Sequence, residues 1–360
     1  MRFPEFSGEW ETKSINDLAD VIGGGTPDTT VKSYWDGGIQ WFTPSEIGKN
    51  KFVDASLRTI TEDGLNNSSA KLLPPNTILL SSRATIGECS LSLRECATNQ
   101  GFQSLVSKKC NVDFLYYLIQ TKKKDLIRKS CGSTFLEISA NEVRKIQVSV
   151  PSDVEQQKIA WLLSLIDKRI ASQNKIIDKL QSLIKGIAQN IVSNNKPNIR
   201  LSDCLDCSSS TLQESDVCET GIYPVYGANG IVGYLDNYNT EGEAVYIIKD
   251  GSGVGIVSYA TGKCSATGTL NTLQAKDGYS LQYLYYILKV FNFEPYKTGM
   301  AIPHIYFKDY GKAKIFCPSY TEQLRYARLQ SAIDSKLSVE KNILTSLSSQ
   351  KQYLLRQMFI

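Results

Sequence analysis

Apolar residues spaced alternately by four and three form the clearest pattern in the chain, and this pattern occurs twice. A heptad series about five repeats long predicts a helix over residues 153–192, and a weaker series predicts another over 319–360. The first series follows Pro151 and contains Ile159, Leu163, Ile166, Ile170, Gln173, Ile177, Leu180, Ile184, Ile187 and Ile191. The second follows Pro318 and contains Tyr326, Ile333, Leu337, Leu344, Leu347, Leu354 and Met358, interrupted by Gln330, Glu340 and Lys351.

The two apolar seams are expected to pack against each other as an antiparallel coiled coil. In the alternative, each helix is the core helix of its own domain. This conflicts with predicted lengths of about 40 residues, because such helices are longer than a globular domain of this size is wide. Antiparallel helices related by a pseudo-twofold bring their midpoints together, so Gln173 and Glu340 are expected to face one another and set the register. The competing possibility is that both side chains point into solvent.

The region before each helix is predicted to contain strands. Short apolar runs such as Thr77–Leu80 and Ala244–Ile248 are separated by turns rich in Gly, Asn and Asp. The fold class that follows is α+β, with two mixed α/β heads that are each followed by a long helix.

An internal repeat supports this organisation. Residues 113–119 return as 282–288 at an offset of 169, whereas 132–138, 145–151 and 155–167 return at an offset of 167 as 299–305, 312–318 and 322–334. The chain is therefore predicted to hold two copies related by a pseudo-twofold. Their boundaries are a first head over 1–152, a helix over 153–192, a linker over 193–199, a second head over 200–318 and a helix over 319–360.

Composition and charge indicate the cellular compartment but do not identify what the chain binds. The 360 residues include no apolar run long enough to cross a membrane and no secretory leader at the start, and the nine Cys suit a reducing compartment, so we expect a cytoplasmic chain without membrane contact. The net charge of +4 is small. Residues 200–318 contain nine Lys and Arg against twelve Asp and Glu, so non-specific attraction to phosphate cannot be the main argument for DNA binding.

The motifs that could carry catalysis or bind a metal or cofactor are incomplete. His304 is the only histidine, and Cys204-Leu-Asp-Cys207 is a lone pair of thiols. The glycine-rich residues 250–255 precede a β-branched run, which indicates a turn between strands, and residues 23–27 lack a P-loop ending and resemble a close-approach loop. We therefore expect no catalytic residues, no metal site and no cofactor.

Polar and aromatic side chains in glycine-punctuated loops are the candidate binding residues, because Arg, Asn, Gln, Ser and Thr can read base edges in the major groove. The same side chains could serve any polar ligand, and the basic run 122–129 could be a solvated helix face. The first-head candidates are Thr26, Trp41, Thr43, Ser45, Ser82, Arg83, Thr85, Asn99, Gln100, Lys122 and Lys123. The second-head candidates are Tyr226, Asn229, Lys249, Ser252, Thr267, Thr269, Asn271, Lys297 and His304.

The doubled head-and-helix order, with Pro151-x-x-x-Glu-Gln-Gln-Lys-Ile159, Tyr226-Gly-Ala-Asn-Gly230 and the glycine-rich run 250–255, resembles the specificity subunit of type I restriction-modification systems. The resemblance implies that each head reads one half of a split site on double-stranded DNA. It implies that the paired helices fix the spacing and dock two methyltransferase subunits, and that restriction subunits join the assembled complex. The chain itself would be non-catalytic.

Two departures and two competing functions remain. The second head has Lys249-Asp-Gly where the first has Ser81-Ser-Arg83, which makes Lys249 the nearest counterpart of Arg83, and Glu322-Gln-Leu-Arg325 only partly repeats Glu155-Gln-Gln-Lys158. The competing functions are an enzyme that acts alone on DNA and a repeat scaffold that binds proteins without reading DNA. The absence of methyltransferase and helicase motifs argues against the enzyme.

Overall fold

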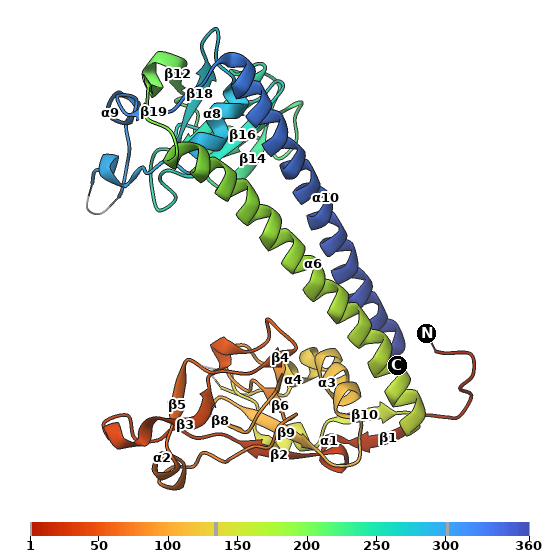
Figure 1. Cartoon of the computed structure of the whole chain (residues 1–360). Coiled ribbons are helices and arrows are strands. Elements are labelled where there is room, and N and C mark those ends of the chain that lie inside the picture. Colours follow the sequence, from red (N-terminus) through yellow and green to blue (C-terminus); the bar gives the residue numbers. More distant parts are fainter. Residues whose placement is uncertain (1, 133–135, 300–301, 360) are drawn as a thin grey trace. The chain divides into compact units, whose positions relative to one another are not determined.

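Two α/β units make up the computed structural model, which describes residues 2–132, 136–299 and 302–359 (Figure 1). Unit 1 comprises Met1–Gln173 and Ile343–Ile360, and unit 2 comprises Asn174–Asn342. Each unit therefore contains one head and part of both long helices. This division differs from the boundaries expected from sequence, which kept the heads and the helices apart.

The first head contains a five-stranded sheet with strand order β2-β9-β6-β7-β4, a three-stranded sheet β5-β3-β8 and the antiparallel pair β1-β10. The strands are β1 (Glu11–Ser14), β2 (Ala19–Gly23), β3 (Trp35–Phe42), β4 (Phe52–Val53), β5 (Arg58–Ile60), β6 (Ile78–Leu80), β7 (Cys89–Ser92), β8 (Cys96–Thr98), β9 (Gln103–Ser107) and β10 (Gln147–Val150). The helices are α1 (Ile15–Leu18), α2 (Glu62–Asn66), α3 (Val112–Thr121), α4 (Lys123–Arg128) and α5 (Ala140–Arg144).

The second head contains a four-stranded sheet β12-β18-β15-β16, a three-stranded sheet β14-β13-β17 and the pair β11-β19. The strands are β11 (Ile199–Arg200), β12 (Leu205–Ser209), β13 (Tyr223–Gly227), β14 (Gly230–Leu235), β15 (Glu243–Ile248), β16 (Val257–Thr261), β17 (Ser265–Ala266), β18 (Leu270–Ala275) and β19 (Lys314–Ile315). The helices are α7 (Leu201–Cys204), α8 (Leu281–Leu288) and α9 (Phe307–Tyr310).

The strand order confirms the internal repeat. The order β2-β9-β6-β7 in the first head corresponds to β12-β18-β15-β16 in the second, and the first sheet has a further strand, β4. The smaller sheets also correspond, because β3 pairs with β8 in parallel and β13 pairs with β17 in parallel. The apolar runs predicted as strands form β6 and β15. The predicted α+β fold class, with two mixed α/β heads, is confirmed.

Both predicted long helices are present, as α6 (Asp153–Ser193) and α10 (Tyr320–Met358). Their apolar seams face inward, since every seam residue of both series is buried or half-buried. None of the helices in the described ranges is long and apolar enough to cross a membrane.

In each unit the two long helices contribute opposite ends. In unit 1, Leu163 near the start of α6 shares a core with Leu354 and Met358 near the end of α10. In unit 2, Gln330 near the start of α10 donates a hydrogen bond of 3.3 Å to the carbonyl oxygen of Ile184 near the end of α6. The helix directions within each unit are therefore antiparallel, as the sequence predicted.

A repeated glutamine ties each long helix to its head. The Oε1 atom of Gln156 accepts a hydrogen bond of 3.0 Å from the backbone N–H of Asn111, the N-cap residue of α3. The Oε1 atom of Gln323 accepts the equivalent bond of 2.9 Å from Ser280, the N-cap residue of α8. The glutamine of the Glu-Gln motif thus serves packing, because its amide oxygen accepts the backbone N–H of the N-cap residue of the head helix.

A repeated tyrosine–aspartate pair forms the second connection. The Tyr117 hydroxyl donates to Asp167 at 2.6 Å, and the Tyr286 hydroxyl donates to Asp334 at 2.7 Å. Burial raises the pKa of both phenols, so both remain protonated donors. In each unit the bond joins the head helix, α3 or α8, to one long helix.

Candidate nucleic-acid interface

The first head gathers polar side chains where β3 and β8 end. Because these strands pair in parallel, with Phe42 opposite Thr98, the loops that follow them leave the sheet together. The backbone N–H of Asn99 donates to the carbonyl oxygen of Phe42 at 3.1 Å, and Thr26, from the loop after β2, donates through its hydroxyl to Gln100. Thr43 and Ser45 follow β3 and share a hydrogen bond of 3.0 Å between their hydroxyls. Five predicted site residues therefore lie in one cluster.

Gly24 permits the close backbone approach that builds this cluster. A Cβ atom at this position would overlap the carbonyl oxygens of Thr98 and Asn99. The next residue, Gly25, donates its N–H to Thr98 O at 2.8 Å. The prediction of a close-approach loop at residues 23–27 is confirmed at this position.

Replacing Gly24 with Ala is therefore expected to lower the free energy of unfolding of the first head by about 1–3 kcal/mol, because the added methyl group meets backbone atoms that cannot move aside singly. Gly38→Ala is the matched control in the same head, since an added Cβ there meets nothing within 4 Å. Urea unfolding of both variants measures the difference. Equal stability of the two variants would contradict the steric argument.

Arg83 lies in a strained loop between β6 and β7. The following residue, Ala84, has a φ of 54°, which is uncommon for a residue other than glycine and is concentrated at functional sites. The Arg83 guanidinium forms an ion pair of 2.8 Å with Glu137, and its side chain is 42% exposed. The guanidinium is thus accessible, but DNA would have to share it with Glu137 or replace that carboxylate.

The structure corrects the sequence alignment of the two heads at this loop. The N–H of Ile138 donates to Ser82 O at 3.1 Å, and the N–H of Ile305 donates to Lys249 O at 2.9 Å. Lys249 therefore occupies the position of Ser82, and the expected alignment of Lys249 with Ser81 was wrong by one residue. The error arose because short loops offer no periodic pattern to fix an alignment.

The residue that corresponds to Arg83 is Asp250. Isolated antiparallel bridges join Arg83 to Glu137 in the first head and Asp250 to His304 in the second. A carboxylate, Asp250, thus stands where the first head has the guanidinium of Arg83, and an imidazole, His304, stands where it has the carboxylate of Glu137. The two heads share one backbone frame at this point and differ in the charge that each side presents.

The second head brings several of its candidates together in the same way. Thr267 donates its N–H to Tyr226 O at 2.9 Å, and Lys249 donates its N–H to Thr269 O at 3.0 Å. Lys249 in turn accepts from the residue after His304. These five residues therefore lie along adjoining strand ends.

The remaining second-head candidates lie at loop tips or in ion pairs. Asn229 is exposed at the turn between β13 and β14, and Ser252 is exposed in the loop between β15 and β16. The predicted turn between strands at residues 250–255 is confirmed. Lys297 is half-buried and pairs with Glu294 at 2.6 Å.

The candidates around the start of α4 flank the Arg83 loop. Lys123 pairs with Glu88, which follows that loop, while Lys122 is half-buried at the N-cap of α4. Thr85 is exposed, and its hydroxyl donates to the Ser81 hydroxyl at 3.2 Å. Thr85 belongs to the loop itself, whereas Lys122 and Lys123 lie beside it.

Four candidates are buried and offer no contact surface in this conformation: Trp41, Ser82, Thr267 and Asn271. The Trp41 indole donates to Gly25 O at 2.9 Å, and the Asn271 amide donates to the Tyr310 hydroxyl at 3.0 Å. Thr267 shares a hydrogen bond of 2.8 Å with Thr269. We therefore leave these four out of the proposed contact surface and assign them to its support.

The cysteine pair consists of one buried thiol, Cys204, and one half-buried thiol, Cys207. Burial raises the pKa of Cys204 to about 12 and that of Cys207 to about 11, so both are protonated at neutral pH. Among the described residues, no three His, Cys, Asp or Glu side chains lie close enough to hold a metal ion.

The family of the chain follows from comparison with known proteins. The family model for the type I restriction modification DNA specificity domain matches residues 7–182 and 197–349, so the chain belongs to this family. The EcoprrI specificity subunit of Escherichia coli is 25% identical over 356 residues, which are 91% of this chain and 88% of that protein. The MjaIX specificity subunit of Methanocaldococcus jannaschii is 39% identical over 180 residues, which are 48% of this chain and only 42% of that protein.

Solved structures agree on the fold. The type I restriction-modification S subunit from M. genitalium superposes with a TM-score of 0.65 at 19% identity and covers 100% of this chain and 99% of its own. A chain from a study of complex assembly and conformational transition of the type I system superposes with a TM-score of 0.58 at 14% identity and covers 98% of both. The predicted non-catalytic specificity component is confirmed by the family.

Proposed function

We propose that this chain reads a bipartite site on double-stranded DNA, with one half-site for each head. The single observation that carries the proposal is a repeated frame with exchanged side chains. The bridge between Arg83 and Glu137 recurs between Asp250 and His304 on the same backbone pattern. A shared frame that presents Arg83 in one head and Asp250 in the other suits two surfaces that read different base sequences by the same approach.

The long helices are proposed to dock two methyltransferase subunits, through which restriction subunits join the complex. Exposed large apolar side chains recur along α6 at spacings that place them on one face, away from the seam. These residues are Val154, Trp161, Leu165, Ile176 and Leu183, whereas the exposed Val192 near the end of α6 lies on another face. Exposed apolar surface of this kind marks protein interaction sites. The proposed setting is the cytoplasm, with no membrane contact and no cofactor.

The exposed face of α10 gives weaker evidence for docking of a methyltransferase subunit than that of α6. The exposed apolar residues of α10 do not fall on one helix face, because their positions along the helix are irregular: Tyr320, Leu329, Val339, Ile343 and Tyr353. The start of this helix also carries the sequence departure at residues 322–325. Two methyltransferase subunits are therefore proposed to bind with unequal affinity.

Selection from a random duplex pool tests the function. The full chain, with and without its methyltransferase partner, is mixed with the pool, and bound duplexes are recovered by gel shift and sequenced. Two short conserved blocks at a fixed separation are expected among the recovered duplexes. Binding of the partner without enrichment of any sequence would instead support a protein scaffold that does not read DNA.

Gln173 and Glu340 remain the predicted register pair of the helices. Both side chains are buried, with 8% and 6% exposure, so neither points into solvent. Their pairing is expected to appear as a coupling of about 0.5–3 kcal/mol in a double-mutant cycle with Gln173→Leu and Glu340→Leu, measured by urea unfolding. Additive effects of the two substitutions would exclude a direct pair.

A further inference from the structure

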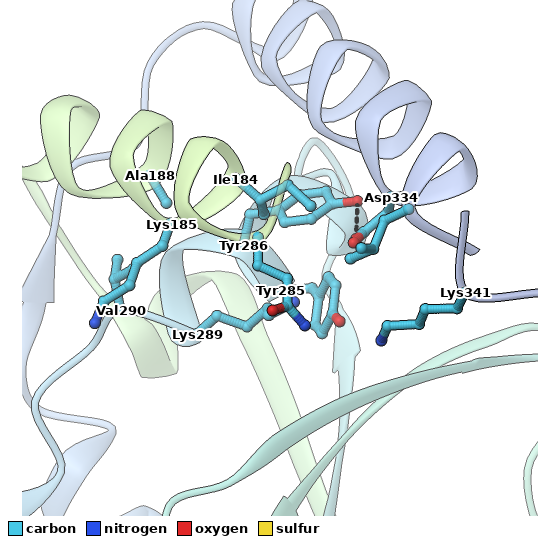
Figure 2. A pocket seen from close by; sticks show the side chains of 11 residues that line it. Ile184, Lys185, Ala188, Tyr285, Tyr286, Lys289, Val290, Asp334 and Lys341 are labelled. Carbon is cyan, nitrogen blue, oxygen red and sulfur yellow. Dashed lines mark hydrogen bonds between the residues drawn. The ribbon is translucent and has the colours of Figure 1, made fainter. Parts of the chain in front are cut away.

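A cavity of about 430 Å³ in unit 2 lies among α6, the end of α8 and α10 (Figure 2). Lys185 comes from α6, Lys289 follows α8 and Lys341 comes from α10. The Lys289 ammonium lies 5.0 Å from the ring centroid of Tyr285, and Figure 2 shows Lys341 extending toward the same tyrosine. Three lysines from three elements therefore line one cavity, with Lys289 and Lys341 extending toward Tyr285 and Lys185 extending on the side of Val290.

The internal repeat shows that the fold does not require these lysines. The offsets of 167 and 169 that relate the two tyrosine–aspartate pairs also identify the equivalent positions in the other copy. All three equivalents are neutral amides: Gln352 for Lys185, Asn174 for Lys341 and Gln120 for Lys289. A copy of the same frame folds with amides at these positions, so the lysines serve another purpose.

The lysine that pairs with the aspartate of the tyrosine–aspartate pair is present in one copy only. In unit 1, Lys351 forms an ion pair of 2.7 Å with Asp167. The position equivalent to Lys351 is Ile184, so Asp334 lacks the counterpart of this lysine. Three lysines and one aspartate leave a net charge of +2 around the cavity (+3 − 1).

We propose that this cavity binds a compact phosphorylated anion. Lysine binds phosphate as a point charge, and a volume of this size falls within the range of about 300–1,000 Å³ typical of small-molecule sites. The net positive charge favours an anion with two or more charges, and the Tyr285 hydroxyl supplies a further donor. This site is separate from the DNA-reading surfaces of the heads and does not depend on them.

Titration calorimetry with the full chain tests the proposal, with inorganic pyrophosphate and magnesium-free adenosine triphosphate as the two probes. If both probes bind, the cavity recognises the phosphoryl groups. If only the nucleotide binds, the cavity recognises the base as well as the phosphoryl groups. The triple exchange Lys185→Gln, Lys289→Gln, Lys341→Asn installs the side chains of the other copy, so we expect the fold to be retained. We expect its affinity to fall at least tenfold and the wild-type affinity to weaken as salt is raised.

The control removes the same charge elsewhere in unit 2, through Lys308→Gln, Lys312→Gln and Lys314→Gln, and should leave the affinity unchanged. Val290→Trp, which keeps all three lysines and fills part of the cavity, should also abolish binding and decides the matter if the triple exchange unfolds. Absence of binding by either probe, or equal losses in the exchange and the control, overturns the proposal. So does lysine-dependent binding of a polyglutamate peptide alone, because that result assigns the cavity to a protein partner.

Discussion

Replacing Arg83 with Ala is expected to relax one position of one half-site by about 1–3 kcal/mol, which is roughly a 5- to 150-fold loss of discrimination. The reason is that a guanidinium bonded to a guanine edge supplies two donors that alanine lacks. The other half-site should keep its full discrimination, since Arg83 belongs to the first head. Competition binding with duplexes that vary one base at a time measures both half-sites together.

Two variants make this result specific to Arg83. Glu137→Gln removes the carboxylate that holds the guanidinium at 2.8 Å, and should strengthen DNA binding or change the preferred base. Arg94→Ala, which breaks an exposed ion pair of 2.7 Å with Asp54 in the same head, should leave both half-sites unaltered. Equal changes at both half-sites, or the same effect from Arg94→Ala, would contradict a base contact by Arg83.

The long helices were predictable because their evidence is periodic and local. A heptad seam that begins with Ile159, Leu163 and Ile166 predicts a helix, its buried face and its length from one continuous segment of the sequence. The internal repeat then aligns the second helix with the first, so an error in one helix boundary does not shift the other. The observed helix ends fall within two residues of the predicted ends.

The candidate site was less predictable because tertiary partners decide which polar side chains are exposed. Trp41 and Asn271 lie in segments of the composition expected for binding loops, yet both side chains are buried. Trp41 donates to the carbonyl oxygen of Gly25, and Asn271 donates to the hydroxyl of Tyr310. Nothing adjacent in the sequence signals either partner.

The partner of Arg83 was missed for a related reason. Glu137 is 54 residues away, and the pair exists only because an antiparallel bridge brings the two segments together. The repeat aligned Glu137 with His304 at the offset of 167, but only the two bridges identify Asp250 as the counterpart of Arg83.

Removing one heptad from both long helices is expected to abolish binding to the original split site. Each helix runs from one unit into the other, so the proposal makes helix length the determinant of the spacer between half-sites. Deleting residues 170–176 and 337–343 removes Gln173 and Glu340 together and keeps both seams in phase. Seven residues shorten each helix by about 10 Å at 1.5 Å per residue, which corresponds to about three base pairs at 3.4 Å each.

A shorter spacer also rotates one half-site about the duplex, because three base pairs are nearly a third of a turn of about 10.5 base pairs. The heads themselves rotate by only about 20°, since seven residues are almost two helical turns. The double deletion is therefore expected to bind weakly even to its best spacer. A duplex library with randomised spacer length measures both effects, and each single deletion serves as a control that should lose thermal stability through mismatched seams. A stable double deletion that retains the original half-sites and the original spacer would show that the helices do not set the distance.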